Sequence, residues 1–180
     1  MQVQSTPLFG LLHLTPRRFD DGRGFFAEVW NAQTFAKAGL DLHFVQDNHS
    51  LSRDPGTIRG LHFQAPPSAQ GKLVRCGRGA LFDVALDIRK GSSTYGQWWG
   101  AELSAENGAM LWIPEGFAHG FVTRMPDTEI CYKCTGFYDP SAEGAIRWDS
   151  AGIDWGLTGD PILSDKDAEA PPLEALATPF

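Results

Sequence analysis

The segment from Arg59 to Gln64 carries the side chains best suited to chemistry. It reads Arg-Gly-Leu-His-Phe-Gln, and Lys72 follows eight residues later. His62 is a natural general base, because an unperturbed imidazole titrates at about 6.5, close to working pH. Arg59 and Lys72 could hold an anionic substrate beside it. The pattern therefore favours an enzyme that moves a proton on a negatively charged substrate, over a histidine with only a structural hydrogen bond.

Tyr132 is a second candidate for proton transfer. It lies in the sequence Glu-Ile-Cys-Tyr-Lys-Cys, in which strand alternation would place Ile130, Tyr132 and Cys134 on one, mainly apolar face. A phenol is protonated at neutral pH and can donate a proton, and a buried hydroxyl needs a partner. Alone it would be interpreted as a core tyrosine, but together with a base it becomes a candidate acid.

A metal site is the main alternative for histidines in such a chain. Barrels of the type expected below often bind a metal through His-x-His, a later Glu and a further His. Here the first pair would be His62 and Gln64, so the motif is broken, and His119 gives only two histidines. We expect no metal and no cofactor. Cys131-x-x-Cys134 has no second pair and is treated as a chance spacing.

The composition is that of a soluble globular protein. We expect a single domain over residues 1–180, because this length suffices for one core. The net charge of −7 argues against a general nucleic-acid binder, which would be basic. We find neither a signal-peptide pattern nor an apolar run near the ~18 residues of a membrane span. Three cysteines do not suit a full disulfide framework, so we expect a reduced, cytoplasmic protein.

The elements that position these residues are expected to be mostly strands. In residues 81–89 apolar side chains alternate with Asp83, Asp87 and Arg89, so one face should be buried and the other wet or lining a polar cavity. Other strands are expected at 44–46, 57–64, 72–76, 109–113, 120–123 and 129–135, with hairpin turns at 77–79 and 91–96. So many short strands indicate an all-β sandwich or barrel.

Helices should be few and short. Asn31 can cap a helix that runs to Ala38 and stops at Gly39. The sequence Ser-x-x-Asp at 164–167 fits a capping signature and predicts a second helix. The tail after about residue 169 should be peripheral, loosely packed or docked on the surface.

Arg59 does not fit a regular strand that also presents His62. Strict alternation would place the two side chains on opposite faces. They can share a pocket only if Arg59 lies at the mouth of the strand, or if Gly60 carries a bulge.

The order of several short motifs resembles the cupin-fold epimerases that act on deoxythymidine-diphosphate (dTDP) sugars, the dTDP-4-dehydrorhamnose 3,5-epimerase family. The resemblance runs from about Phe9 to Asp167, and the motifs are specific through their combined order and spacing. They are residues 19–28, 45–50, 59–64, 71–72, 114–121, 132–133, 138, 143 and 163–167. The resemblance implies a cupin-type double-stranded β-helix, or jelly-roll barrel, with a few short peripheral helices.

The resemblance also implies an activity, the epimerisation of dTDP-4-dehydro-6-deoxy-D-glucose at sugar carbons 3 and 5 to dTDP-4-dehydro-L-rhamnose. Both carbons flank the ketone, so proton loss gives an enolate delocalised onto the carbonyl oxygen. By this resemblance His62 would remove the proton, and Asp167 would hold its tautomer. Lys72 would stabilise the enolate oxygen. Tyr132 would return a proton from the opposite face of the sugar.

Substrate-binding residues follow from the same resemblance. Arg23 and Arg59 would bind the diphosphate, because guanidinium groups suit phosphate oxygens, and Tyr138 would stack on the thymine ring. The other candidates are Glu28, Gln46, Asp47, Asn48, His119, Glu143 and Lys166. Members of the family are typically homodimers that exchange a segment, which residues 1–40 could supply. No nucleic-acid or membrane partner is implied.

Three alternatives remain open on the sequence. The first is a related epimerase that inverts only one carbon of a dTDP-4-keto-6-deoxysugar, since its proton-transfer residues would be the same. The second is a metal-dependent cupin enzyme that uses His62 and His119. The third is a sugar-binding module without enzymatic activity. For Asp167 the alternative role is a helix cap.

Overall fold

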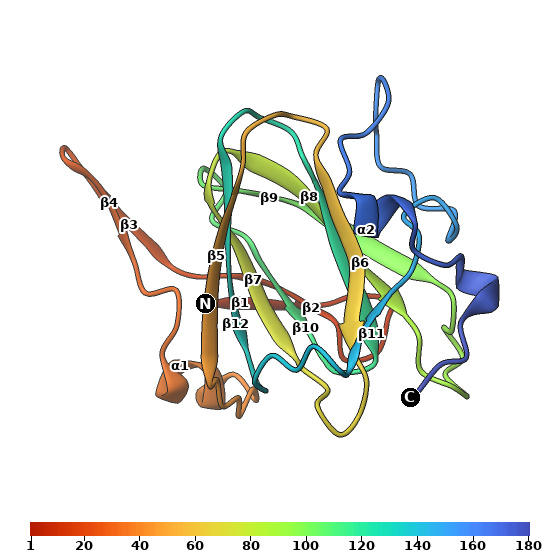
Figure 1. Ribbon diagram of the computed structural model, residues 1–180. Coiled ribbons are helices and arrows are strands. Elements are labelled where there is room, and N and C mark those ends of the chain that lie inside the picture. The colour runs from red at the N-terminus through yellow and green to blue at the C-terminus, as the bar shows by residue number, and fades with distance from the viewer.

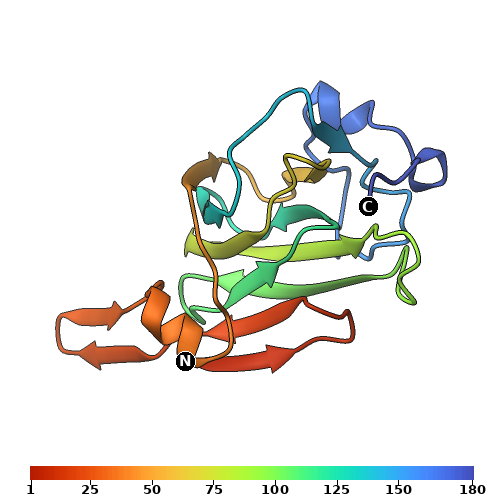
Figure 2. The same cartoon turned by 90° about the horizontal axis from the view of Figure 1, so that it is seen from below.

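Two antiparallel sheets face each other in the structure, a computed structural model that describes residues 1–180 (Figures 1 and 2). The first sheet has the order β1 (Gln2–Ser5), β2 (Leu12–Thr15), β10 (Met110–Ile113), β7 (Lys72–Arg78), β12 (Thr128–Cys134), β5 (Gln46–Ser52). The second has the order β13 (Glu143–Ala145), β6 (Ile58–Gln64), β11 (Phe117–Thr123), β8 (Ala80–Asp87), β9 (Trp98–Ser104). The all-β prediction is confirmed.

The main core lies between the two sheets. It joins Val74 and Ile130 of the first sheet to Leu81, Ala85 and other buried apolar residues of the second. A second cluster lies on the other face of the five-stranded sheet, where the chain after β13 covers residues such as Val84. The inner strands β8 and β11 are therefore covered on both sides, and the face of β8 that carries Asp83 and Asp87 is fully buried rather than wet.

Helices are as scarce as expected. Asn31 caps α1 (Ala32–Lys37) by accepting hydrogen bonds from the backbone of Gln33 and Thr34. Ser164 caps α2 (Asp165–Ala168), and a short 3-10 helix follows at Leu173–Ala175. The C-terminal tail docks on the surface: Leu173, Leu176 and Phe180 pack against the second cluster. No helix is both long and apolar enough to cross a bilayer.

Several predicted boundaries are wrong. The strand expected at 44–46 starts only at Gln46 and continues to Ser52, and β11 begins three residues before the predicted Gly120. The turn at 77–79 does not close a hairpin, because β7 and β8 belong to different sheets. The turn at 91–96 does connect two paired strands, β8 and β9. Strands β1, β2, β3, β4, β9 and β13 were not predicted.

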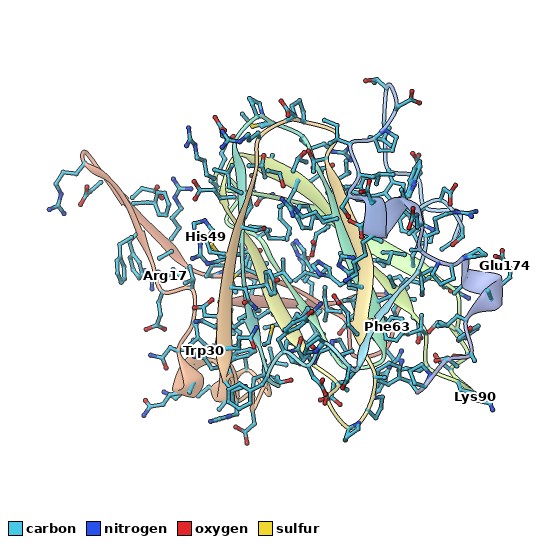
Figure 3. All side chains as sticks on the ribbon, in the orientation of Figure 1. Arg17, Trp30, His49, Phe63, Lys90 and Glu174 are labelled. Carbon is cyan, nitrogen blue, oxygen red and sulfur yellow. The ribbon has the colours of Figure 1, made fainter.

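A two-stranded hairpin, β3 (Arg18–Asp21) and β4 (Gly24–Ala27), projects from the body of the molecule (Figure 1). Its side chains extend away from the two sheets, beyond the labelled Arg17 at its base, whereas Trp30 lies beside α1 (Figure 3). Phe25 and Phe26 on this hairpin are exposed. A folded chain rarely leaves large aromatic side chains uncovered on one element, so this hairpin has the character of a contact surface.

Candidate active site

An irregularity in β6 brings Arg59 and His62 to one side of the strand. In the pairing of β6 with β11, His62 lies opposite His119 and Arg59 lies opposite Phe121. Three steps along β6 therefore match two steps along β11, which makes a bulge of one extra residue. Gly60 lies within it at φ 123°, a conformation that favours glycine. Arg59 and His62 line the same pocket, as the bulge interpretation requires.

His62 is held by Asp167 of α2. The distance from His62 Nε2 to Asp167 Oδ1 is 2.6 Å, and the carboxylate is almost fully buried. The other carboxylate oxygen accepts a hydrogen bond from the Ser164 hydroxyl at 2.9 Å, while the Asp167 N–H donates back to that hydroxyl. The Asp167 side chain therefore contacts both His62 and Ser164, the residue whose hydroxyl caps α2.

Lys72 and Tyr132 reach the same pocket from the other sheet, on β7 and β12. Burial lowers the pKa of the Lys72 ammonium, and the negative charges nearby only partly oppose this. Burial also raises the pKa of the Tyr132 phenol, so it stays protonated at neutral pH. The pocket thus holds an imidazole, a lysine amino group and a protonated phenol on walls contributed by two sheets.

The rim of the pocket carries a linked polar network. Glu143 accepts a hydrogen bond from the Tyr138 hydroxyl at 3.2 Å and pairs with the Lys166 ammonium at 2.6 Å. Gln46 accepts from the Tyr138 backbone N–H at 2.8 Å and donates to Asn48 at 3.1 Å. These contacts fix the exposed Tyr138 ring at the mouth of the pocket.

A metal is not favoured by the arrangement of donors. No group of three histidine, cysteine or carboxylate side chains is close enough to share an ion. His62 and His119 each bind a carboxylate through Nε2, Asp167 and Asp83 respectively. The three cysteines are free thiols.

Comparison with known proteins places this geometry in a family. The family model described as dTDP-4-dehydrorhamnose 3,5-epimerase matches residues 5–175. The chain belongs to this family. A dTDP-4-dehydrorhamnose 3,5-epimerase from Salmonella typhimurium is 54% identical over 97% of this chain and 96% of its own length. The family is one of isomerases, and its members have a cupin-like fold, so the predicted resemblance, fold and enzyme class are confirmed.

Two further relatives bear on the substrate. The crystal structure of the epimerase from Legionella pneumophila, in complex with dTDP-4-keto-L-rhamnose, is 43% identical, with a TM-score of 0.93 and coverage of 97% of this chain and 94% of that one. A dTDP-4-dehydrorhamnose 3-epimerase from Streptomyces niveus is 38% identical over 94% of this chain and 83% of its own length. The second shows that a single-carbon epimerase is similar in sequence.

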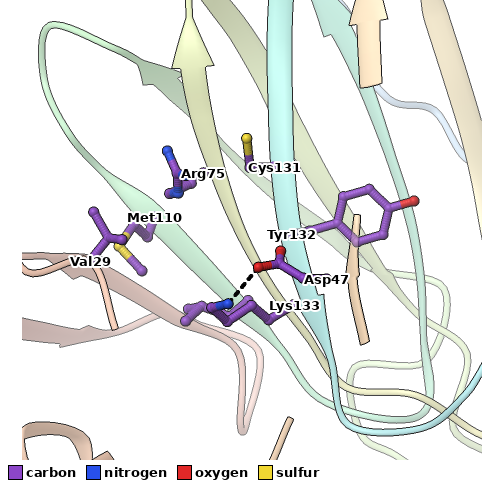
Figure 4. Close-up of a pocket in the computed structure, with 8 residues that line it drawn as sticks. Val29, Asp47, Arg75, Met110, Cys131, Tyr132 and Lys133 are labelled. Carbon is purple, nitrogen blue, oxygen red and sulfur yellow. Dashed lines mark hydrogen bonds and ion pairs between the residues drawn. The ribbon is translucent and has the colours of Figure 1, made fainter. Parts of the chain in front are cut away.

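Asp47 does not lie in the pocket, contrary to the expectation for this family. Alternation along β5 sends Gln46, Asn48 and Ser50 to the pocket side and Asp47 to the other side of the sheet. There Asp47 pairs with Lys133 at 2.6 Å, next to Arg75 and Cys131 (Figure 4). In the same view the Tyr132 ring leaves β12 on the opposite side (Figure 4).

Arg23 and Glu28 also lie away from the pocket of their own chain. Arg23 is at the tip of the β3–β4 hairpin, 91% exposed and paired with Asp21 at 2.6 Å. Glu28 accepts hydrogen bonds from Asn31 and Thr34 at the start of α1. The structure therefore does not bring these two predicted binding residues together with the rest of the site.

The pocket also contains residues that no sequence motif predicts as part of the site. Gln64 and Gln70 line the part near Tyr138, and Ser50 lines the part near Arg59. Asp83 lies behind the pocket, bonded to His119 at 2.7 Å. In the sequence, Asp83 stands out as an acidic residue inside a strand of alternating apolar residues. Its partner His119 is 36 residues away, so the sequence pattern around Asp83 does not predict their contact.

Proposed function

We propose that this chain epimerises dTDP-4-dehydro-6-deoxy-D-glucose at sugar carbons 3 and 5 to dTDP-4-dehydro-L-rhamnose. One observation carries the proposal: His62 of β6 and Tyr132 of β12 line a single pocket from opposite sheets. Inversion at a carbon requires removal of a proton from one face and its return to the other. A base and an acid on facing walls suit that requirement.

The base in this proposal is His62. Because a carboxylate can only accept, the Nε2 proton is directed at Asp167, and Nδ1 is left to take the proton from the sugar. Asp167 also stabilises the imidazolium that results. The carboxylate itself is fixed by Ser164, so the ring is oriented before substrate arrives.

Lys72 and Tyr132 complete the proton transfer. An ammonium in a buried site acts strongly on the developing enolate oxygen, because little water screens it there. Tyr132 keeps its proton until the enolate carbon accepts it from the opposite face. No redox step occurs, because each carbon starts and ends in the same oxidation state.

The nucleotide end would be bound by cations and an aromatic ring. Arg59, which donates to the Ser52 hydroxyl and the Leu51 carbonyl, and Lys166 at the rim are suited to the diphosphate. Tyr138 is suited to stacking on the thymine ring. Gln46, Asn48, His119 and Glu143 would complete the contacts of the substrate.

The homodimer and the cytoplasmic location belong to this proposal as well. We infer that the β3–β4 hairpin reaches a partner chain, so that Arg23 and Glu28 act in the partner's pocket. The exposed Phe25 and Phe26 support this, because a dimer would cover them. Asp47, on the outer face of the same sheet as the pocket, would then bind no substrate directly.

A single-carbon epimerase remains the second candidate, since the Streptomyces niveus relative is named as one. The test is incubation with the dTDP-4-keto sugar, coupled to a 4-reductase, with NMR assignment of the product. Inversion at both carbons is expected. Inversion at one carbon would favour the second candidate, and ligand binding without turnover would favour a binding module.

A further inference from the structure

A second carboxylate–imidazole pair lies beside the first. His119 of β11 is directly opposite His62 of β6 in the strand pairing, and its side chain lines the same pocket. Its Nε2 is 2.7 Å from Oδ1 of Asp83, which is fully buried on the neighbouring strand β8. The mechanism above assigns Asp83 no role.

The second carboxylate oxygen of Asp83 is buried without a hydrogen-bond partner. Asp83 Oδ2 is the one buried side-chain polar atom in the chain without a hydrogen-bond partner. A buried carboxylate with an unpaired oxygen is unfavourable for folding, so the presence of Asp83 at this position is not explained by stability. Its negative charge also acts on Lys72, where it opposes the lowering of the pKa by burial.

The geometry constrains the proton on His119. An ionised carboxylate has no proton to give, so the hydrogen bond requires a proton on Nε2. In a neutral ring Nδ1 then has a free lone pair. Nδ1 has no protein partner, and it is not among the buried atoms without one, so it is open to the pocket.

We propose that Asp83 is a positioning residue for His119, holding the ring as the Nε2–H tautomer so that Nδ1 accepts a hydrogen bond from a hydroxyl group of the bound sugar. Asp83 does not line the pocket itself, so it reaches the bound sugar by direct contact only through His119. Only the kinetic part of this inference rests on the proposed function. The tautomer can be measured without substrate.

The test compares Asp83→Asn with the wild-type protein. An asparagine of the same shape can turn its NH₂ toward Nε2, so the ring proton would move to Nδ1, as a carboxylate-to-amide change does in other histidine–carboxylate pairs. Nitrogen-15 NMR of the imidazole nitrogens reports which one carries the proton. A His119→Gln variant identifies the His119 signals among those of the five histidines.

The matched control is Asp87→Asn. Asp87 is on the same strand, is equally buried and binds Arg89, Ser92 and Thr94 rather than a histidine. Its replacement should lower the melting temperature without changing the His119 tautomer. A general disturbance of β8 is thereby separated from the loss of positioning.

We expect the Nε2–H tautomer in the wild type, the Nδ1–H tautomer in Asp83→Asn, and a fall in kcat/KM of about 10- to 100-fold, the scale of one lost hydrogen bond to a charged or polar group. Asp83→Glu should restore the tautomer. A wild-type ring protonated on Nδ1 alone would overturn the proposal even if no variant folds. So would an Asp83→Asn protein with unchanged tautomer and kinetics. Correct tautomers without turnover of the dTDP sugar would instead contradict the proposed function.

Discussion

At the scale of single residues, Tyr132 is the group whose role is easiest to isolate. Burial raises the pKa of its phenol, so it is a proton donor throughout the neutral range. Tyr132→Phe keeps the ring and removes the proton. We expect epimerised product to fall about 10²- to 10⁴-fold, the usual contribution of a positioned acid, while His62 still exchanges the sugar proton with solvent. Proton NMR in deuterated water measures both, and normal yield of epimerised product would contradict this role.

The Asp167 carboxylate contacts both His62 and Ser164, the cap of α2, and two substitutions separate the effects of these two contacts. Ser164→Ala removes the cap of α2 and should cost about 1 kcal/mol of stability, with activity retained within a few-fold, because His62 keeps its partner. Asp167→Asn should reduce kcat about 10²- to 10⁴-fold, because His62 loses the carboxylate that fixes its tautomer. Equal loss of activity in both variants would mean that Asp167 acts mainly through the helix.

The acid stability of the protein should reflect the same carboxylate. Burial alone would raise the pKa of Asp167, but the hydrogen bonds from His62 and Ser164 outweigh it, and the pKa lies below its ordinary value of 3.8. A carboxyl group whose pKa is lower in the folded than in the unfolded state stabilises the fold at every pH above its unfolded-state pKa. This stabilisation is lost as the pH falls through the folded-state pKa. The difference in free energy of unfolding between the wild type and Asp167→Asn should therefore become smaller below pH 3.8. Urea unfolding at pH 7 and pH 3 would measure it, and a constant gap would contradict it.

At the scale of elements, the bulge in β6 decides whether Arg59 and His62 can act together. A Cβ at Gly60 would lie 2.6 Å from Gly120 Cα and 2.6 Å from the His119 carbonyl oxygen, and backbone cannot easily move away. Gly60→Ala should cost on the order of 2–4 kcal/mol and most of the activity. Gly56→Ala is the control: it has φ 78° but only Leu157 nearby, at 4.0 Å, so about 1 kcal/mol is expected. Similar effects of the two variants would contradict this view of the bulge.

The bulge also shows how far sequence reasoning reaches. For Arg59 and His62 to share a pocket, the sequence left two options, Arg59 at the mouth of the strand or a bulge at Gly60, and the structure has the bulge. The same alternation along residues 46–48 places Asp47 on the opposite side of the strand from Gln46 and Asn48, whereas the family resemblance groups all three.

Other features depend on contacts between distant segments, which no local pattern contains. Asp83 meets His119 only because β8 and β11 pair. The turn at 77–79 resembles a hairpin, yet its two strands go to different sheets. Short, exposed strands such as β3 and β4 give little periodic signal, since neither face is buried in a single chain.

At the scale of the whole molecule, the proposal that the projecting hairpin reaches a partner's pocket can be tested by mixing two inactive variants. If Arg23 acts in a partner's pocket, an Arg23→Ala protein and a His62→Asn protein should complement each other, because each mixed dimer has one pocket with both residues. When equal amounts of the two variants are dissociated and reassociated, half of the dimers should be mixed, and each mixed dimer has one complete site in two. The mixture should therefore have about a quarter of wild-type activity. Steady-state rates of the mixture and of each variant alone measure this.

The matched controls concern the contact itself. Phe25→Asp should shift the protein toward monomer in sedimentation, while Tyr95→Asp, an exposed aromatic on the turn between β8 and β9, should not. No recovery of activity in the mixture, with dimers still present, would contradict the exchange of the hairpin. Arg23 would then have no catalytic part in this protein.

The central claim is that His62 initiates proton transfer at both carbons next to the ketone. The most direct measurement is deuterium incorporation from solvent into the dTDP-4-keto sugar, followed by NMR at each carbon for the wild type and for His62→Asn. The account predicts deuterium at carbons 3 and 5 with the wild type and a fall of about 10²-fold or more at both with the variant. Label at one carbon only, or undiminished exchange in His62→Asn, would contradict it.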